Sequence, residues 1–350
     1  MFRSPFIRQF IRISHLSRPV RKFHHDQSRM SSRSSTGRTS QSRNGFAQVN
    51  FTKADIPPSS FWYTRIKPPL VQDDEVSPTE CFEACTQYAS LAIKDAPGWR
   101  HRNLTTSEKA DDGTIPIFTL HWAAIIMLLY PFQKVVSLAT HILQTGVMLG
   151  YAPSILTLAR MGLERNILDK PLFAPTKEAL EKLAASKKGP YTKYRPDTLT
   201  LMGIMYARLG TPAGEDQALQ CFSEAENAAS ASGTKAEWGW RALAMKEQCE
   251  IYVRRKETTR AYELLRENIR ELDNPDLCFQ YAMLLDFDDP RRLTMLGKAA
   301  VSGYIPAARE MARMERVRAA AEDLTDWERF ARGVRGDEWF AIAEKKAATP

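Results

Sequence analysis

Residues 150–161 read GYAPSILTLARM, and residues 303–314 read GYIPAAREMARM. Six of the twelve positions are identical, namely Gly150/Gly303, Tyr151/Tyr304, Pro153/Pro306, Ala159/Ala312, Arg160/Arg313 and Met161/Met314. A glycine with a left-handed backbone commonly ends a helix, and a proline is compatible with the first turn of the next helix. The shared pattern therefore predicts the same kind of turn between helices in both stretches, and one helical unit that repeats along the chain.

A third segment carries the same pattern more fully. It contains Met202, Gly203, Tyr206, Gly210, Asp216, Ala218, Phe222, Ala225 and Ala228. We expect Gly203 and Ala218 where two helices of one hairpin cross closely, because small residues allow a close approach. Tyr206 and Phe222 are expected to fill the layer between neighbouring hairpins.

These residues resemble the tetratricopeptide superfamily, and in particular its Sel-like variant, in which a leucine–glycine pair, a later Tyr and Gly, an Asp and a run of alanines recur. The segment GKAAVSGYIPAA at 297–308 is similar to the junction between two such units. The resemblance covers roughly residues 135–345. It implies an all-α solenoid of helix hairpins, with residues 113–348 as the repeat domain, and a groove that binds proteins. An irregular helical bundle is the alternative fold.

The spacing of apolar residues predicts a series of helices with short breaks between them, and no convincing strand. The helices expected after Tyr151 span 176–186, 196–209, 216–231, 236–254, 258–272, 275–285, 291–302, 306–321, 325–332 and 337–346.

Upstream of the repeats, the chain divides into an arm and a helix. Residues 51–76 hold four prolines and the aromatic cluster Phe61-Trp62-Tyr63, which predicts an extended arm anchored on the folded body. A partner-binding motif is the alternative for the aromatic cluster. Ser77, Pro78 and Glu80 form a strong helix start, so residues 77–112 are expected to be a helix followed by a charged loop.

The first fifty residues have the composition of a mitochondrial transit peptide. The chain has 49 basic and 41 acidic residues, and residues 1–50 alone contain ten basic residues and one acidic residue. These fifty residues therefore have a net charge of +9. The remaining 300 have a net charge of −1, and the whole chain has +8. Residues 2–13 place Phe and Ile beside Arg at helical spacing, and a Ser/Arg-rich segment that is nearly free of acid follows. The alternative is a disordered basic tail.

Two stretches of the chain contain no charged residue and could be buried in the fold or inserted in a membrane. Residues 114–132 and 135–159 contain apolar runs interrupted by polar residues and prolines, and the runs are shorter than the roughly 20 apolar residues of a membrane-spanning helix. We expect buried helices in both. Association with the inner membrane through residues 113–159 is the alternative.

Residues of the types that serve in catalysis, metal binding or nucleic-acid binding are scattered along the chain. Cys81 and Cys85 share one helical face, but no further ligands accompany them, so we expect packing thiols. His121 and His141 lie among apolar residues, where a hydrogen-bonded core histidine is expected. The strongest basic groups are Arg254-Arg255-Lys256 and the arginines Arg309, Arg313, Arg316 and Arg318. The latter are interleaved with Glu310, Glu315 and Glu322 and are expected on a salt-bridged, solvated helix face.

The sequence thus predicts a non-enzymatic mitochondrial adaptor or assembly factor, with no catalytic residues, cofactor or metal. Its partner is expected to be a protein in a helical groove, with respiratory-complex biogenesis as the process and the matrix, or the matrix face of the inner membrane, as the location. An RNA- or ribosome-associated factor of mitochondrial gene expression is the alternative. The residues expected to support the repeats are Gly150, Tyr151, Pro153, Gly203, Tyr206, Gly210, Ala218, Phe222, Gly303, Tyr304 and Pro306.

Overall fold

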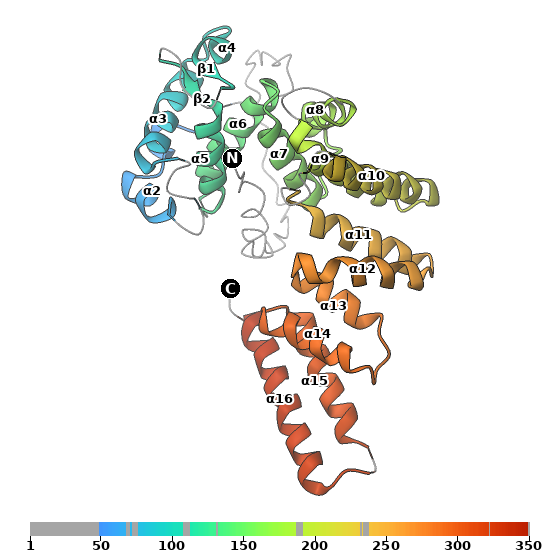
Figure 1. The fold of residues 1–350 in the computed structure, drawn as a ribbon. Coiled ribbons are helices and arrows are strands. Elements are labelled where there is room, and N and C mark those ends of the chain that lie inside the picture. The colour runs from blue at the N-terminus through green and yellow to red at the C-terminus, as the bar shows by residue number, and fades with distance from the viewer. Residues whose placement is uncertain are drawn as a thin grey trace, which may run out of the picture. The chain divides into compact units, whose positions relative to one another are not determined.

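The fold is almost entirely α-helical (Figure 1), which confirms the all-α class. The computed structural model describes residues 49–67, 71, 76–107, 113–130, 132–186, 192–231, 233, 238–321 and 323–348. The predicted transit segment therefore lies almost wholly outside the described residues. Contacts divide the chain into an N-terminal unit, Met1–Met202 with Asn227–Glu237, and a C-terminal unit, Gly203–Glu226 with Trp238–Pro350.

The N-terminal unit is built around helix α5, which is buried on nearly all sides. Helix α5 packs against α3 and α6, α6 packs against α7, and α7 packs against α8. The elements are η1 (Lys53–Asp55), α2 (Ser59–Arg65), α3 (Pro78–Lys94), α4 (Trp99–Asn103), β1 (Leu104–Thr105), β2 (Ile115–Pro116), α5 (Ile117–Leu128), α6 (Gln133–Met148), α7 (Ala152–Glu164), η2 (Pro171–Phe173), α8 (Ala174–Ala185) and η3 (Thr192–Tyr194).

The predicted start of α3 is confirmed. The side chain of Ser77 accepts a hydrogen bond from the backbone N–H of Glu80, and the Glu80 carboxylate accepts one from the N–H of Ser77. This reciprocal pair satisfies two backbone donors that a helix start otherwise leaves without partners.

The predicted arm and loop are partly wrong. Residues 59–65 form helix α2, because Pro58 stands at its N-cap, where a proline costs no helical hydrogen bond. Trp62 of α2 is buried and donates its indole N–H to the carbonyl of Pro57, so the aromatic cluster is anchored as expected. In place of the first part of the loop, the chain forms α4 and the strand β1, which pairs in parallel with β2.

Both stretches without charged residues form helices with buried side chains, as expected. Ile117, Leu120 and Ile126 of α5 are buried, as are Leu138 and Ile142 of α6. Among the described helices, none combines the length and the apolar content that crossing a bilayer requires.

The C-terminal unit consists of helices that pack as successive pairs: α11 with α12, α13 with α14, and α15 with α16. Helices α12 and α13 also contact each other, as do α14 and α15, and α11 contacts α13. The helices are α11 (Arg241–Arg254), α12 (Thr258–Leu272), α13 (Pro275–Met283), α14 (Pro290–Val301), α15 (Ile305–Ala319) and α16 (Asp326–Ala348), and the division between the units passes through α9 (Arg195–Ala207) and α10 (Pro212–Ala231). Because the connections are short, partners within a pair run antiparallel.

Helix α16 corrects the prediction of two helices over 325–332 and 337–346. Gly333 and Gly336 indicated a break, but the helix continues through both. A Cβ atom at Gly336 would lie 3.3 Å from the carbonyl oxygen of Ala312 in α15. The glycine therefore allows α15 and α16 to approach closely, rather than ending a helix.

Candidate functional site

The two echoing stretches form junctions of the same geometry. Gly150 and Gly303 both adopt a left-handed backbone, with φ of +70° and +92°. The N–H of Tyr151 donates a hydrogen bond to the carbonyl of Gly146, and the N–H of Tyr304 donates one to the carbonyl of Ala299. In each case the acceptor is five residues earlier in the chain. Pro153 and Pro306 then occupy the second position of α7 and α15. Each junction is a Schellman motif, which satisfies the last carbonyls of one helix and starts the next.

The third segment places a glycine against an aromatic ring. A Cβ atom at Gly203 would lie 2.5 Å from Cε1 of Phe222, so α9 and α10 cross where only glycine fits. Phe222 therefore fills the crossing inside this pair, contrary to the expectation that it lies between pairs. Ala218 is fully buried, and Gly210 ends the turn with φ of +65°.

Tyr206 contributes to the same crossing through its backbone. Its side chain is half-buried, and its carbonyl oxygen lies 2.7 Å from where a Cβ of Gly214 would stand. Gly214 is a supporting position that the sequence comparison missed, because no equivalent glycine follows the other two turns.

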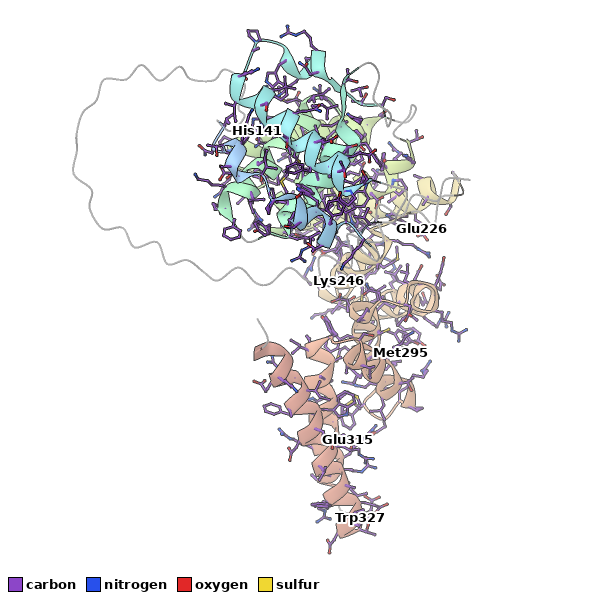
Figure 2. All side chains as sticks on the ribbon, turned by 90° about the vertical axis from the view of Figure 1, so that its left-hand side faces the viewer. His141, Glu226, Lys246, Met295, Glu315 and Trp327 are labelled. Carbon is purple, nitrogen blue, oxygen red and sulfur yellow. The ribbon has the colours of Figure 1, made fainter. Side chains whose placement is uncertain are left out.

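Polar side chains gather where the first helices of successive pairs meet. Lys246 of α11, labelled in Figure 2, lies with its Nζ 4.0 Å from Oδ1 of Asp276 in α13. Gln280 of α13 donates its Nε2–H to Oε1 of Glu250 in α11 at 3.2 Å. Tyr304, which precedes α15, lies near Asp276. We name this surface the first-helix face, and define it by Lys246, Glu247, Glu250, Asp276, Gln280 and Tyr304.

The first-helix face is acidic and not fully paired. It carries three carboxylates and one ammonium group, and the charges of Arg208 and Arg254 also act on Glu247. Burial, and then the neighbouring Glu250, raises the pKa of Glu247. Oε1 of Gln280 is buried and accepts no hydrogen bond. Burial and the carboxylate of Asp276 raise the pKa of Tyr304. Glu247, Glu250 and Asp276 are half-buried, so their carboxylates can accept hydrogen bonds from outside the chain, whereas the buried Oε1 of Gln280 cannot.

The basic groups that the sequence singled out are largely paired within the chain. Arg255 donates to Oε2 of Glu215 at 2.8 Å and to Oδ1 of Asp216 at 2.8 Å, and Arg254 donates to Oε1 of Glu215 at 3.0 Å. These hydrogen bonds raise the pKa of Arg255 and lower that of Glu215. Both arginines are therefore paired with acidic residues of α10.

The arginines of α15 are paired in the same way. Arg313 forms two hydrogen bonds with Glu310, Arg309 pairs with Glu344, and Arg316 pairs with Asp337. The guanidinium of Arg318 lies 5.7 Å from the ring centre of Phe287.

The two central histidines are core residues, as expected. His141 Nδ1 lies 2.8 Å from the hydroxyl of Tyr88, and His121 Nδ1 lies 3.0 Å from that of Ser154. Burial lowers the pKa of His141 to about 4, with a smaller contribution from Arg100, and lowers that of His121 to about 3. Both imidazoles are neutral at pH 7.

The cysteines are packing residues as well. Cys81, Cys85, Cys249 and Cys278 are buried, and Cys221 is half-buried. Burial raises the pKa of the Cys81 thiol to about 12, which removes it as a nucleophile at neutral pH. In the part of the chain that the structure describes, no three His, Cys, Asp or Glu side chains are grouped to hold a metal ion.

One signal in the sequence pointed toward the first-helix face. Cys249 and Cys278 are 29 residues apart, and both are buried. Asp276 of α13 likewise follows Glu247 of α11 by 29 residues, so the two acidic residues lie at equivalent positions of the two helices. The pairing of Gln280 with Glu250 had no comparable signal, because it depends on how α11 packs against α13.

Comparison with known proteins gives no assignment: no family model matches the chain, and neither a curated protein nor a solved structure is significantly similar to it.

Proposed function

We propose that this chain is a non-enzymatic mitochondrial adaptor or assembly factor that binds another protein through the first-helix face. The observation that supports it most is that face itself, in which carboxylates of successive first helices meet and outnumber the one lysine among them. A partner segment rich in Lys or Arg would supply the opposite charge.

The proposal includes a tetratricopeptide-like solenoid. Successive antiparallel pairs, contact between the first helices α11 and α13, and the two identical junctions all support a repeat of one supersecondary unit. In such an arrangement the first helices line one continuous surface, which is where an extended partner segment would bind.

A binding experiment can test this face directly. The double variant Glu247→Gln/Glu250→Gln removes two negative charges from α11, and Glu263→Gln/Glu267→Gln removes two from exposed positions of α12. Proximity labelling in intact mitochondria should identify a protein that the wild type and the α12 variant both label. The α11 variant should label it at least about 10-fold less. Equal labelling by all three proteins would reject the first-helix face as the binding surface.

The compartment is a separate part of the proposal. The charge and composition of residues 1–50 support import into mitochondria, with the matrix or the matrix face of the inner membrane as destination. A fusion of these residues to a fluorescent reporter should colocalise with mitochondria, and a diffuse cytosolic signal would contradict it. Subunits of the respiratory complexes are the first class of partner to examine.

The alternative function, an RNA- or ribosome-associated factor, has less support. Arg254 and Arg255 are the centre of the strongest basic run, and both are held by Glu215. If RNase or high salt moves the protein from a large to a small species on a sucrose gradient, the RNA function replaces the adaptor function.

A further inference from the structure

Two tyrosines stack where consecutive helix pairs of the C-terminal unit meet. Tyr262 lies on α12 and Tyr281 on α13, and these two helices pack against each other (Figure 1). The ring centres are 5.5 Å apart and the ring planes differ by 22°, so the two phenols are nearly parallel. Tyr281 is 4% exposed and Tyr262 is half-buried, so Tyr262 is the ring that a reagent in solution reaches first.

Two arginines lie beside the more exposed ring. Nη1 of Arg291 donates a hydrogen bond to the hydroxyl of Tyr262 at 3.2 Å. The carboxylate of Asp289 fixes this guanidinium, because it accepts hydrogen bonds from Nε at 3.0 Å and from Nη2 at 2.6 Å. The guanidinium of Arg266 lies 5.8 Å from the ring centre of Tyr262. Positive charge is therefore held next to both the hydroxyl and the ring of Tyr262.

These neighbours make the two phenols chemically unequal. Tyr281, and then Arg291, lower the pKa of Tyr262, because both stabilise its phenolate. Burial, and then Tyr262, raise the pKa of Tyr281. A phenolate releases an electron more readily than a phenol does, so Tyr262 is the side chain at which oxidation of the pair begins.

The stacked arrangement determines what an oxidised tyrosine does next. Loss of one electron and the hydroxyl proton gives a tyrosyl radical, whose unpaired electron spreads to the ring carbons next to the hydroxyl. Two such radicals join through these carbons to form dityrosine. Because the second phenol is already held beside the first, the coupling needs no encounter between two chains, and proximity favours it strongly.

We propose that Tyr262 and Tyr281 form an oxidative modification site, at which hydrogen peroxide and a haem peroxidase link the two rings as an intramolecular dityrosine. Each tyrosine loses its hydroxyl proton and one electron, and these reduce the peroxide to two molecules of water. One carbon–carbon bond forms between the rings. The two ring hydrogens at that bond then move to the oxygens as protons, which restores both phenols.

The new bond has a mechanical consequence. It joins α12 to α13, and therefore ties two successive helix pairs together. It also closes a loop between residues 262 and 281, which restricts the unfolded chain as a disulfide does. The cross-linked protein is therefore expected to unfold at a higher urea concentration. This inference does not depend on the binding function of the first-helix face.

Oxidation of the full chain with a haem peroxidase and limiting hydrogen peroxide tests the site. Mass spectrometry of a protease digest should show a peptide from α12 joined to a peptide from α13, with the loss of two hydrogen atoms. Tyr262→Phe and Tyr281→Phe should each reduce this product at least about 10-fold, because phenylalanine cannot form the radical that proximity couples. Tyr63→Phe is the control: Tyr63 is 61% exposed and lies in the N-terminal unit, so its removal should leave the yield unchanged.

Urea denaturation provides the second readout. Oxidised wild type should unfold at a higher urea concentration than untreated protein, whereas oxidised Tyr262→Phe should not. Equal helical circular dichroism shows that the variants are folded, and the peptide map of the wild type locates the bond without them. Dityrosine that persists in Tyr262→Phe, that disappears in Tyr63→Phe, that forms only between chains or that does not form at all would overturn the proposal.

Discussion

At the scale of single residues, Arg100 determines the hydrogen-bonding state of His141. Arginine has donors only, so Nε2 of His141, 3.4 Å from Nη2 of Arg100, must accept. The proton of the neutral imidazole is then on Nδ1, which donates to the hydroxyl of Tyr88. That hydroxyl can donate to Oγ1 of Thr145 at 2.6 Å. One partly buried cation thus orients a buried network that joins α3, α4 and α6.

The stability of the fold is expected to fall in acid because of these histidines. The pKa of His141 is about 4 in the folded chain, below its ordinary value of 6.5. The unfolded chain therefore takes up the proton first, and stability is lost as the pH falls from about 6.5 towards 4. The full effect is on the order of 3 kcal/mol, from about 1.4 kcal/mol for each pKa unit.

The variant His141→Asn isolates this contribution. Asparagine keeps a donor near Tyr88 but cannot titrate, so its free energy of unfolding should depend less steeply on pH between 4 and 6.5. Urea denaturation at several pH values gives both slopes. Identical slopes would contradict the assignment, and the slope that remains in the variant includes the contribution of His121.

Gly203 should tolerate no side chain. We expect Gly203→Ala to destabilise the protein by about 1–3 kcal/mol, because the new methyl group displaces the ring of Phe222. Gly297→Ala is the control: it lies inside α14 with no atom within 4 Å of a new Cβ, and should stabilise by about 0.5–1 kcal/mol. Thermal denaturation measures both. If Phe222→Leu does not reduce the cost of Gly203→Ala, the steric explanation fails.

At the scale of secondary structure, local signals identified most helices. Helix α12 has the predicted bounds, Thr258–Leu272, and α3 begins at its predicted capping box. The elements that the sequence did not predict both depend on contacts between residues far apart in the chain. The β1–β2 pair joins residues eleven apart across a loop, and the continuity of α16 depends on α15, which needs a glycine at position 336. The first-helix face was not found for the same reason, since side-chain contacts between helices leave little trace in spacing.

The carboxylate of Glu315 is expected to hold α16 on α15. It is buried and faces two arginines, so Glu315→Gln should cost about 1–2 kcal/mol, within the range for a partly exposed ion-pair network. Hydrogen exchange should become faster in α16 and stay unchanged in α11. Asp337→Asn breaks a solvent-exposed pair and should cost no more than about 0.5 kcal/mol. Equal effects of the two substitutions would show that burial of Glu315 is irrelevant.

At the scale of the whole molecule, the net positive charge lies almost wholly ahead of the part of the chain that the structure describes. Residues 1–50 hold the positive charge, and the described structure begins at residue 49. Phe51 is already part of the core, since it is buried and its ring centre lies 5.2 Å from that of His141. Any removal of an import signal must therefore stop before Phe51 to leave the fold intact.

Truncated chains can test this limit. A chain that starts at residue 49 should unfold at the same urea concentration as the full chain. A chain that starts at residue 57 loses Phe51 and η1 and should be less stable by about 1–3 kcal/mol. Equal stability of the two truncated chains would show that Phe51 contributes nothing to the core.

The turn after α11 contains a residue whose backbone conformation lowers the stability of the fold. Lys256 has φ of +62°, and the two hydrogen bonds of the glycine junctions recur here: Lys256 N–H donates to the carbonyl of Val253, and Glu257 N–H donates to that of Tyr252. A residue with a Cβ pays about 1 kcal/mol for this conformation, whereas glycine does not. Lys256→Gly should therefore raise the melting temperature in calorimetry, and an unchanged or lower value would refute this. The substitution would thus add thermal tolerance without altering the core or the first-helix face.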